Sequence, residues 1–460
     1  MPHFQQSVEL PVSAAEAYAW HARPGAFERL TPGWEPVRLI QTEPLAEGSR
    51  AELALSLAPL PLEIPWHALH CQVKPGHQFQ DIQQKGPFQR WEHTHRLVPL
   101  SENRCRLEDE IHFEPPLWPL SACALPWIYA KLKRMFDYRH ALTRQDLSQH
   151  AHYARQGVRP MKILVSGASG LIGSALIPFL TTGGHEVLRL SRRRNGNPAN
   201  IYWSPSQGEL DPSALEGLDA VIHLAGESIA DGRWTDAKKQ RILKSRTEGT
   251  RLVAETLARL KSPPQCLISA SAIGYYGDQG ATELDENSPP GDDFLAEVCQ
   301  QWEAACEPAR AAGIRVVNPR IGIVLSSKGG ALEKMLMPFQ LGLGGVLGNG
   351  HQYLSWVAID DVLAAFLHIL ATPSLQGPVN LVSPEPLTNA EFTRILGKVL
   401  LRPTILPVPA FSLRALMGEM ADALLLSSAR VFPERLQDSG FEFRYADISA
   451  ALRHVLGSKH

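Results

Sequence analysis

The stretch MKILVSGASGLIGSALIPFLTTGGHEVLRLSRR (161–193) decides the fold of most of this chain. Its residues 162–165 form a short apolar run, which is typical of a strand buried in a parallel sheet. An apolar helical segment and a second strand, at 186–190, complete a unit of about thirty residues. Between the first strand and the helix stand three glycines: Gly167, Gly170 and Gly173. This order predicts a doubly wound Rossmann sheet that binds a dinucleotide.

The glycine-rich turn is predicted to hold the pyrophosphate of the dinucleotide. In such a turn the first glycine permits a tight bend, the second admits the phosphates, and the third lets the helix pack on the strand. Free backbone N–H groups at the start of the helix then donate to the phosphates. The residues expected to bind the cofactor here are Gly167, Ser169, Gly170, Leu171, Ile172 and Gly173.

The end of the second strand indicates which nicotinamide dinucleotide is bound. An NAD site usually places an acidic residue here for the ribose 2′-hydroxyl. This chain has Ser191, Arg192 and Arg193 instead, and a hydroxyl with guanidinium groups suits the 2′-phosphate of NADP. The alternative is a solvated basic loop. We expect NADP, as NADPH, to be the cofactor.

Further cofactor contacts are expected from three later segments. LDAVIHLAG (218–226) predicts a third strand, with Leu224, Ala225 and Gly226 beside the cofactor and with Asp219 and His223 as structural framework. Arg246 follows on a helix, where it either approaches a phosphate or substrate or belongs to a solvated face. Arg320 ends an apolar strand, and we expect it near the carboxamide of the nicotinamide.

The first 150 residues show a different pattern. Ser13 can cap a helix that runs to Trp20, residues 24–30 suit a second short helix, and apolar residues at helical spacing predict a long helix within 121–150. Alternating segments separated by turn residues predict antiparallel strands at 4–10, 37–44, 50–57, 66–73, 78–84, 88–100 and 105–114.

Two histidines on one predicted strand raise the question of a metal. His93 and His95 share a strand face, a spacing that metal sites also use. Without a third ligand in view, the sequence predicts no metal site. The simpler expectation is that these histidines face solvent while Trp66 and Trp91 pack in the core.

Overall composition places few limits on function. The chain has 460 residues, 44% of them hydrophobic, and a net charge of −2, so nothing favours nucleic acid as a partner. The N-terminus shows no secretory signal, and no apolar stretch reaches the roughly 20 residues that a membrane span needs. Six scattered cysteines form no disulfide or zinc pattern. We therefore expect a cytoplasmic protein.

The motifs GASGLIG, DAVIHLAG, SASAIGYYG (269–277) and WVAIDDV (356–362) together resemble the extended short-chain dehydrogenase/reductases. The resemblance is closest to their atypical, epimerase-like YfcH family and covers about 161–455. It implies an NADP-binding epimerase/dehydratase-like domain over 161–398 and a small family-specific domain over 399–455. The order of elements in 1–150 resembles the START-like, polyketide cyclase-like helix-grip fold, which implies a cavity for an apolar ligand. A polar connector, 151–160, separates the two parts.

The chain departs from the superfamily at the catalytic positions. Ordinary members carry a Tyr and, four residues later, a Lys; this chain has Phe294 and Val298, which cannot transfer a proton. Ser271 and Tyr275 are the nearest remaining candidates for catalysis. Asp292 and Asp293, directly before Phe294, are expected to cap the following helix and not to act in catalysis.

Two interpretations of function follow. The first is an NADP-dependent oxidoreductase or epimerase-like enzyme that acts on an unknown small molecule. The alternative is a non-catalytic NADP-dependent sensor or regulatory binding protein, with an apolar ligand in the N-terminal domain. The extended members often pair through helices, so a homodimer is possible.

Overall fold

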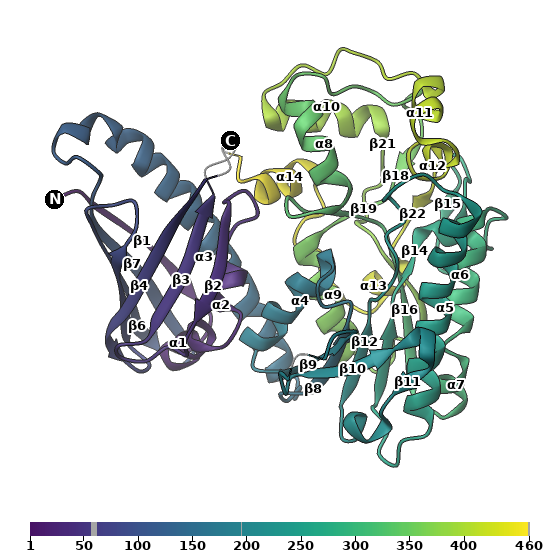
Figure 1. Cartoon of the computed structure of the whole chain (residues 1–460), viewed down its shortest axis with the longest axis horizontal. Coiled ribbons are helices and arrows are strands. Elements are labelled where there is room, and N and C mark those ends of the chain that lie inside the picture. Colours follow the sequence, from purple (N-terminus) through teal and green to yellow (C-terminus); the bar gives the residue numbers. More distant parts are fainter. Residues whose placement is uncertain (57–61, 195, 459–460) are drawn as a thin grey trace. The chain divides into compact units, whose positions relative to one another are not determined.

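The structure is a computed structural model and describes residues 1–56, 62–194 and 196–458 (Figure 1). The chain forms two compact units: Met1–Pro160 with Pro178–His185, and Met161–Ile177 with Glu186–Ser458. Among the described residues, no helix combines the length and the apolar character that crossing a membrane requires. All six cysteines are free thiols.

The N-terminal unit is a seven-stranded antiparallel sheet with three helices. The sheet order is β1-β7-β6-β5-β4-β3-β2. Its strands are β1 (His3–Leu10), β2 (Val37–Thr42), β3 (Arg50–Ser56), β4 (Glu63–Lys74), β5 (Gln78–Lys85), β6 (Arg90–Ser101) and β7 (Arg104–Glu114). Its helices are α1 (Ala14–Ala22), α2 (Ala26–Leu30) and α3 (Leu125–Arg155), the last preceded by a 3-10 turn over Leu120–Ala124. The predicted order of strands and helices is confirmed, except that the predicted strand end at Leu57 lies outside the described residues.

Local sequence patterns explain these elements. The Ser13 hydroxyl accepts a hydrogen bond from the Glu16 N–H at 3.2 Å and so caps α1, as expected. Strand β7 alternates buried and partly exposed residues along its length, so that one face packs against α3. Helix α3 runs to Arg155 and thus includes the first half of the predicted connector 151–160.

The larger unit is built on a sheet of Rossmann order, β11-β10-β9-β8-β12-β13-β16-β14, with β20 also paired to β16; all its pairs are parallel except that of the edge strand β11 with β10. The sheet strands are β8 (Lys162–Ser166), β9 (Glu186–Ser191), β10 (Asn200–Ser204), β11 (Glu209–Leu210), β12 (Ala220–His223), β13 (Cys266–Ser269), β14 (Ser271–Ala272), β16 (Arg315–Ile321) and β20 (Gly377–Leu381). The chain order reverses between β8 and β12, which is where such sheets bind ligands at their carboxyl ends.

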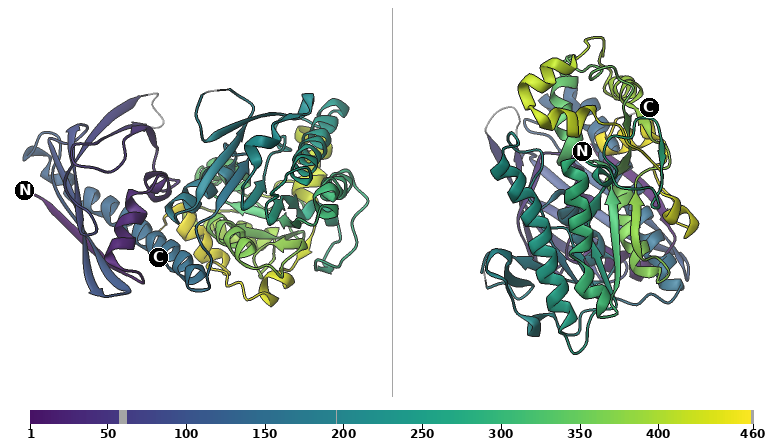
Figure 2. Two further views of the ribbon diagram at one scale, coloured as in Figure 1. Left: turned by 90° about the horizontal axis from the view of Figure 1, so that it is seen from below. Right: turned by 90° about the vertical axis from the view of Figure 1, so that its right-hand side faces the viewer.

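Helices cover both faces of this sheet. Figure 2 shows the long α5 on one face, and its Val253, Ala254 and Leu257 are buried against sheet residues such as Val221. Helix α4 (Leu171–Thr182) begins in this unit, and its residues from Pro178 on are assigned to the N-terminal unit. The other helices of the larger unit are α5 (Asp236–Ala258), α6 (Phe294–Ala304), α7 (Glu307–Ala311), α8 (Gly330–Gln340), α9 (Ile359–Ala371), α10 (Asn389–Leu400), α11 (Ala410–Met417), α12 (Glu419–Ala421), α13 (Glu434–Asp438) and α14 (Ile448–Leu456).

The C-terminal residues belong to the same compact unit. Short strands pair β15 (Glu283–Leu284) with β22 (Arg430–Val431), β17 (Ile323–Leu325) with β19 (Trp356–Ala358), and β18 (Tyr353–Leu354) with β21 (Leu387–Thr388). Helix α14 packs on α10 in one apolar cluster. The predicted separate domain at 399–455 is therefore joined to the Rossmann unit by strand pairing and by a shared core.

Candidate functional site

The glycine-rich turn has the close backbone contacts that its sequence predicts. Gly167 has a φ of +68°, and a Cβ atom there would lie 2.8 Å from the carbonyl carbon of Leu224. A Cβ atom on Gly173 would lie 2.3 Å from the Gly167 carbonyl oxygen, far inside contact distance. Of the other residues expected here, Ser169 and Gly170 are exposed, and Leu171 and Ile172 are partly exposed at the start of α4. The turn is thus tight and has an open outer face.

A buried hydroxyl joins the two strands at the reversal point. Ser166, at the end of β8, lies 2.8 Å from Nδ1 of His223, at the end of β12. Its oxygen also accepts hydrogen bonds from the N–H groups of Leu224 and Ala225, at 3.0 and 3.2 Å. Burial lowers the pKa of His223 to about 4, so the ring is neutral near pH 7 and can accept the Ser166 proton. This network fixes the loop over Leu224–Gly226.

Sequence reasoning placed His223 in the framework but missed Ser166. Asp219 is also framework, because its carboxylate accepts a hydrogen bond from the Lys162 N–H at 2.6 Å. The signal for Ser166 was available, since a small hydroxyl residue stands directly before Gly167 at the end of a buried strand. Its partners, fifty-seven and more residues away, were not visible.

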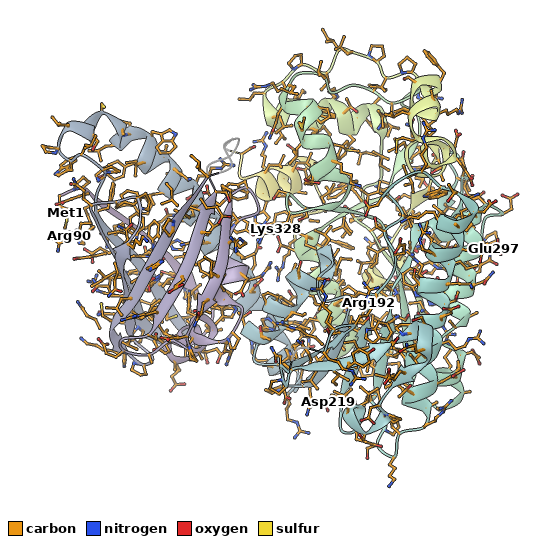
Figure 3. The ribbon with its side chains drawn as sticks, in the orientation of Figure 1. Met1, Arg90, Arg192, Asp219, Glu297 and Lys328 are labelled. Carbon is orange, nitrogen blue, oxygen red and sulfur yellow. The ribbon has the colours of Figure 1, made fainter. Side chains whose placement is uncertain are left out.

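The basic segment after β9 offers two unengaged guanidinium groups. Arg192 and Arg193 are exposed, and neither guanidinium has a hydrogen-bond or ion-pair partner within residues 1–56, 62–194 and 196–458 (Figure 3 labels Arg192). Arg194 is occupied by contrast, with Nη2 3.1 Å from Glu209 and its guanidinium 3.8 Å from the centre of the Tyr202 ring. The Ser191 hydroxyl bonds to the backbone of Arg193 and shapes this bend.

Arg246 lies beside the predicted cofactor loop but is held by backbone oxygens. Its Nη1 donates to the carbonyls of Glu227 and Ile242, at 3.0 and 3.2 Å. Its guanidinium lies against Gly226 and 5.0 Å from the centre of the Trp302 ring. The solvated-face alternative is wrong, because the residue is partly buried and its Nη1 is bonded to the loop after Gly226.

The expectation for Arg320 is wrong. This side chain is 3% exposed and forms two hydrogen bonds with the Glu303 carboxylate, at 2.9 and 3.0 Å. Its Nη1 donates to the Tyr276 hydroxyl at 3.0 Å. The guanidinium is buried and makes three hydrogen bonds within the protein, so the structure places Arg320 as a residue that anchors the loop after β13 and not as a free donor for a carboxamide.

Ser271 is part of the same buried network. Its hydroxyl donates to Glu303 at 2.7 Å and the residue is 2% exposed, so the role in proton transfer that we expected for it is not supported. The Tyr276 hydroxyl donates to the Asn380 side chain at 2.7 Å. Burial raises the pKa of Tyr276 to about 12, which excludes it as a base near neutral pH. Glu303 and Asn380 were not anticipated from the sequence.

Tyr275 remains the accessible proton carrier at this end of the sheet. It is partly exposed, and its hydroxyl has no partner among the residues that the structure describes. The Arg320 guanidinium lies 3.4 Å from the centre of its ring and holds the ring in place. Phe294 begins α6 with its ring against Trp234, and Val298 is buried, so the usual Tyr and Lys positions are apolar in space as well. Asp293 caps α6 as predicted, at 2.8 Å from the Ala296 N–H.

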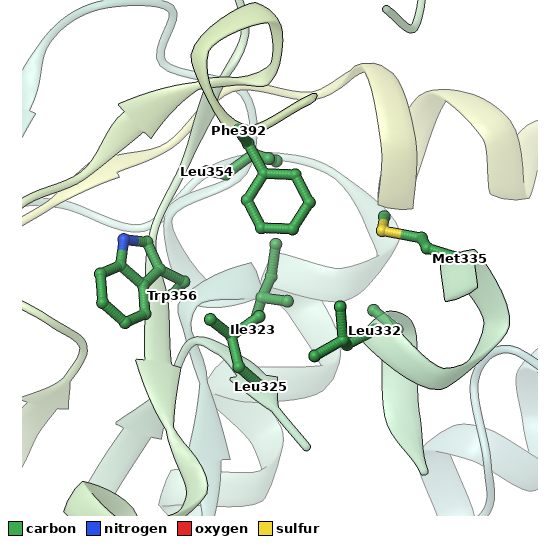
Figure 4. Close-up of a pocket in the computed structure, with 8 residues that line it drawn as sticks. Ile323, Leu325, Leu332, Met335, Leu354, Trp356 and Phe392 are labelled. Atoms are coloured by element: carbon green, nitrogen blue, oxygen red, sulfur yellow. The ribbon is translucent and has the colours of Figure 1, made fainter. Parts of the chain in front are cut away.

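A separate apolar cavity lies near α8 and α10. Figure 4 shows its lining, including Ile323, Leu332, Met335, Trp356 and Phe392. Only about 10 Å³ is left between these side chains, roughly the space of one water molecule. This region is packed core, and we do not assign a ligand to it.

Comparison with known proteins places the larger unit in a family. Residues 163–381 match the model of the NAD dependent epimerase/dehydratase family. An epimerase family protein of Mycobacterium bovis is 44% identical over 293 residues, which are 64% of this chain and 97% of that protein. The chain belongs to the epimerase family.

Two solved structures are also similar to this epimerase-family chain. The human epimerase family protein SDR39U1, solved with NADPH, is 36% identical, with a TM-score of 0.60 over 64% of this chain and 99% of its own. A protein of Corynebacterium glutamicum, described as a nucleoside-diphosphate sugar epimerase, is 33% identical. Its TM-score is 0.81, over 99% of this chain and 90% of its own.

The remaining parts of this epimerase-family chain match families without an assigned role. Residues 35–147 match a domain of unknown function, DUF8410, and residues 408–455 match another, DUF1731. The N-terminal unit is an antiparallel sheet with a long helix, α3.

Proposed function

We propose that this chain binds NADPH in preference to NADH and uses it in reductase or epimerase-like chemistry on a small molecule. The observation that carries the proposal is the pair of unengaged guanidinium groups, Arg192 and Arg193, at the end of β9. Strand β9 lies beside β8, which leads into the glycine-rich turn. The human relative's structure with NADPH supports the same choice.

The residues present fit the cofactor. The glycine-rich turn admits a pyrophosphate against the start of α4, and Leu224 and Ala225 form the opposite border, fixed by Ser166. A guanidinium pair at the end of β9 offers planar, charged donors to a phosphate dianion. Removing these donors should therefore weaken NADPH and leave NADH almost untouched.

The test is the double substitution Arg192→Ala with Arg193→Ala. We expect the dissociation constant for NADPH to rise by about 100-fold or more, since each of the two arginines supplies a charge-assisted hydrogen bond of about 1.5–3 kcal/mol. The dissociation constant for NADH should stay within about twofold of the wild-type value. Both constants are measured by titration of cofactor fluorescence at a fixed salt concentration. Arg194→Ala is the matched control, because that adjacent arginine is engaged with Glu209. Equal affinities of the wild-type protein for NADPH and NADH would overturn the proposal.

For the reaction itself we propose Tyr275 as the proton donor. NADPH held at the glycine-rich turn would supply a hydride to a substrate carbonyl carbon. The Tyr275 hydroxyl would give its proton to the carbonyl oxygen, a role open to it because it is partly exposed and has no partner among the described residues. Ser271 and Tyr276 are both bonded within the protein and are left out of this step.

A panel of carbonyl compounds added to the NADPH-loaded protein tests this step. We expect at least one compound to consume NADPH, and we expect Tyr275→Phe to slow that consumption about 100-fold or more while NADPH affinity is unchanged. Ser271→Ala is the comparison and should act through stability instead. If no compound in a broad panel consumes NADPH, the catalytic part of the proposal fails and only cofactor binding stands.

We also propose a helix-grip, START-like relationship for the N-terminal unit. The support is its order of elements, one strand, two short helices, six strands and a long helix, in an antiparallel sheet. Trp66 and Trp91 pack edge to face, with ring centres 5.2 Å apart, and fill part of the space between sheet and α3.

A further inference from the structure

A row of acids and histidines crosses the buried face of the N-terminal sheet. Asp81 of β5 lies opposite His93 of β6, and His95 of β6 lies opposite Asp109 of β7, so all four side chains share one face. His93, His95 and Asp109 are no more than 8% exposed. The expectation that the two histidines face solvent is therefore wrong. Burying several ionisable groups without a use for them is costly, which marks this row as a candidate site.

The distance between Asp81 and His95 suits a bridging metal ion better than a direct hydrogen bond. Nε2 of His95 lies 3.4 Å from Oδ2 of Asp81, longer than the 2.7–2.9 Å that is typical of a charge-assisted hydrogen bond. Two ligands of a tetrahedral ion with bonds of about 2.0–2.1 Å are separated by about 3.3 Å. One ligand atom from each of Asp81, His93 and His95 lies within 4.8 Å of the other two. The third ligand that the sequence did not reveal is thus Asp81, from the neighbouring strand.

Asp109 orients the histidines from behind. Its carboxylate forms a hydrogen bond with Nε2 of His93 at 2.9 Å and lies 2.6 Å from Nδ1 of His95, a close charge contact without hydrogen-bond geometry. It also lies 2.6 Å from Nε2 of His140, which reaches the row from α3. A carboxylate on the far nitrogen of a histidine fixes the ring and is the usual companion of a metal-binding histidine. This contact leaves Nε2 of His95 directed at Asp81.

The charges of the row also match a divalent cation. Two carboxylates, Asp81 and Asp109, share this interior, the Arg139 guanidinium interacts with the charge of both, and His70 lies 3.1 Å from Oδ1 of Asp81. A divalent cation would compensate the remaining negative charge while the histidines stay neutral, as metal-bound histidines must be. Imidazole and carboxylate together favour Zn²⁺ or a related first-row ion over Mg²⁺ or Ca²⁺.

We propose that the N-terminal unit binds one divalent transition-metal ion, best matched by Zn²⁺, through the Asp81 carboxylate and a ring nitrogen each of His93 and His95. Asp109 is the positioning residue behind the two histidines. Three protein ligands leave a fourth position for water or for a small ligand.

Titration of untagged, chelator-stripped, full-length protein with Co²⁺ alone tests the proposal. We expect one Co²⁺ per chain, with the visible absorption of a four-coordinate site, and displacement of this signal by Zn²⁺. Asp81→Asn and His95→Gln should each weaken Co²⁺ binding by about 100-fold or more, and Asp109→Asn by about 10–100-fold. Circular dichroism reports whether each variant folds. Asp81→Asn is decisive if His95→Gln does not fold, because the Asp81 side chain is 25% exposed and tolerates change better.

A second cluster provides the control. His3, Glu110 and His112 also approach one another closely, but on the opposite, more exposed face of the sheet. His112→Ala should leave the Co²⁺ spectrum unchanged. The proposal is overturned if the wild-type protein shows no stoichiometric Co²⁺ signal, if His112→Ala removes the signal, or if the signal survives both Asp81→Asn and His95→Gln.

Discussion

Replacing Gly173 by alanine is expected to weaken NADPH binding by about 10- to 100-fold and to lower the stability of the Rossmann unit. The added Cβ atom would lie 2.3 Å from the Gly167 carbonyl oxygen and 2.9 Å from its carbonyl carbon. Both neighbours are backbone, so neither can rotate away, and the start of α4 must move off the turn. Overpacking of this kind costs about 1–3 kcal/mol. The same displacement moves the N–H groups that would meet the pyrophosphate.

Gly249→Ala is the matched comparison for Gly173→Ala. Gly249 is also helical and buried, but its added Cβ would lie 3.4 Å from the Trp203 ring, an ordinary contact. We expect NADPH affinity and the melting temperature of this variant to stay close to those of the wild-type protein. Fluorescence titration and thermal unfolding measure both quantities. If Gly173→Ala binds NADPH as tightly as Gly249→Ala does, the turn is not the phosphate site.

Replacing Arg320 by alanine is expected to lower the free energy of unfolding by about 3–5 kcal/mol. The guanidinium is buried and bonded to both oxygens of Glu303, whose side chain is itself only 14% exposed. Removing the guanidinium leaves a buried carboxylate without its charged partner. It also removes one hydrogen bond to the Tyr276 hydroxyl. It also removes the group that lies on the Tyr275 ring, so NADPH consumption should fall together with stability.

Denaturant unfolding of Arg320→Ala beside Arg194→Ala measures this difference. Arg194 and Glu209 form an exposed pair, and such pairs contribute about 0–1 kcal/mol. The double variant Arg320→Ala with Glu303→Gln should recover part of the lost free energy of unfolding, because it no longer buries the uncompensated charge of Glu303. Similar destabilisation in the two single arginine variants would show that the Arg320 pair is no more important to the fold than a surface pair.

Much of the fold could be predicted because its signals are local. Three glycines between a strand and a helix, a serine before α1 and an aspartate before α6 each act within a few residues of their own position. Backbone geometry and capping depend on such short segments. The structure therefore confirms these elements where the sequence predicted them.

Much of the candidate site could not be predicted because its contacts are distant in sequence. Arg320 meets Glu303 and Tyr276, and Asn380 joins from a fourth segment. An arginine at the end of a strand has the same local pattern whether it binds a cofactor or a buried carboxylate. The same limit concealed Asp81, which reaches His95 only because β5 and β6 are paired.

The isolation of Arg192 and Arg193 bears on how this protein can evolve. No part of the described fold depends on their guanidinium groups, whereas Arg194, Arg246 and Arg320 are all tied into it. Selection on the cofactor can therefore act at these two positions without disturbing the scaffold. If they bind the 2′-phosphate as we propose, a lineage could exchange one nicotinamide pool for the other through one or two codon changes. Substitutions at the same two positions could be used to change the preference of the protein between NADPH and NADH.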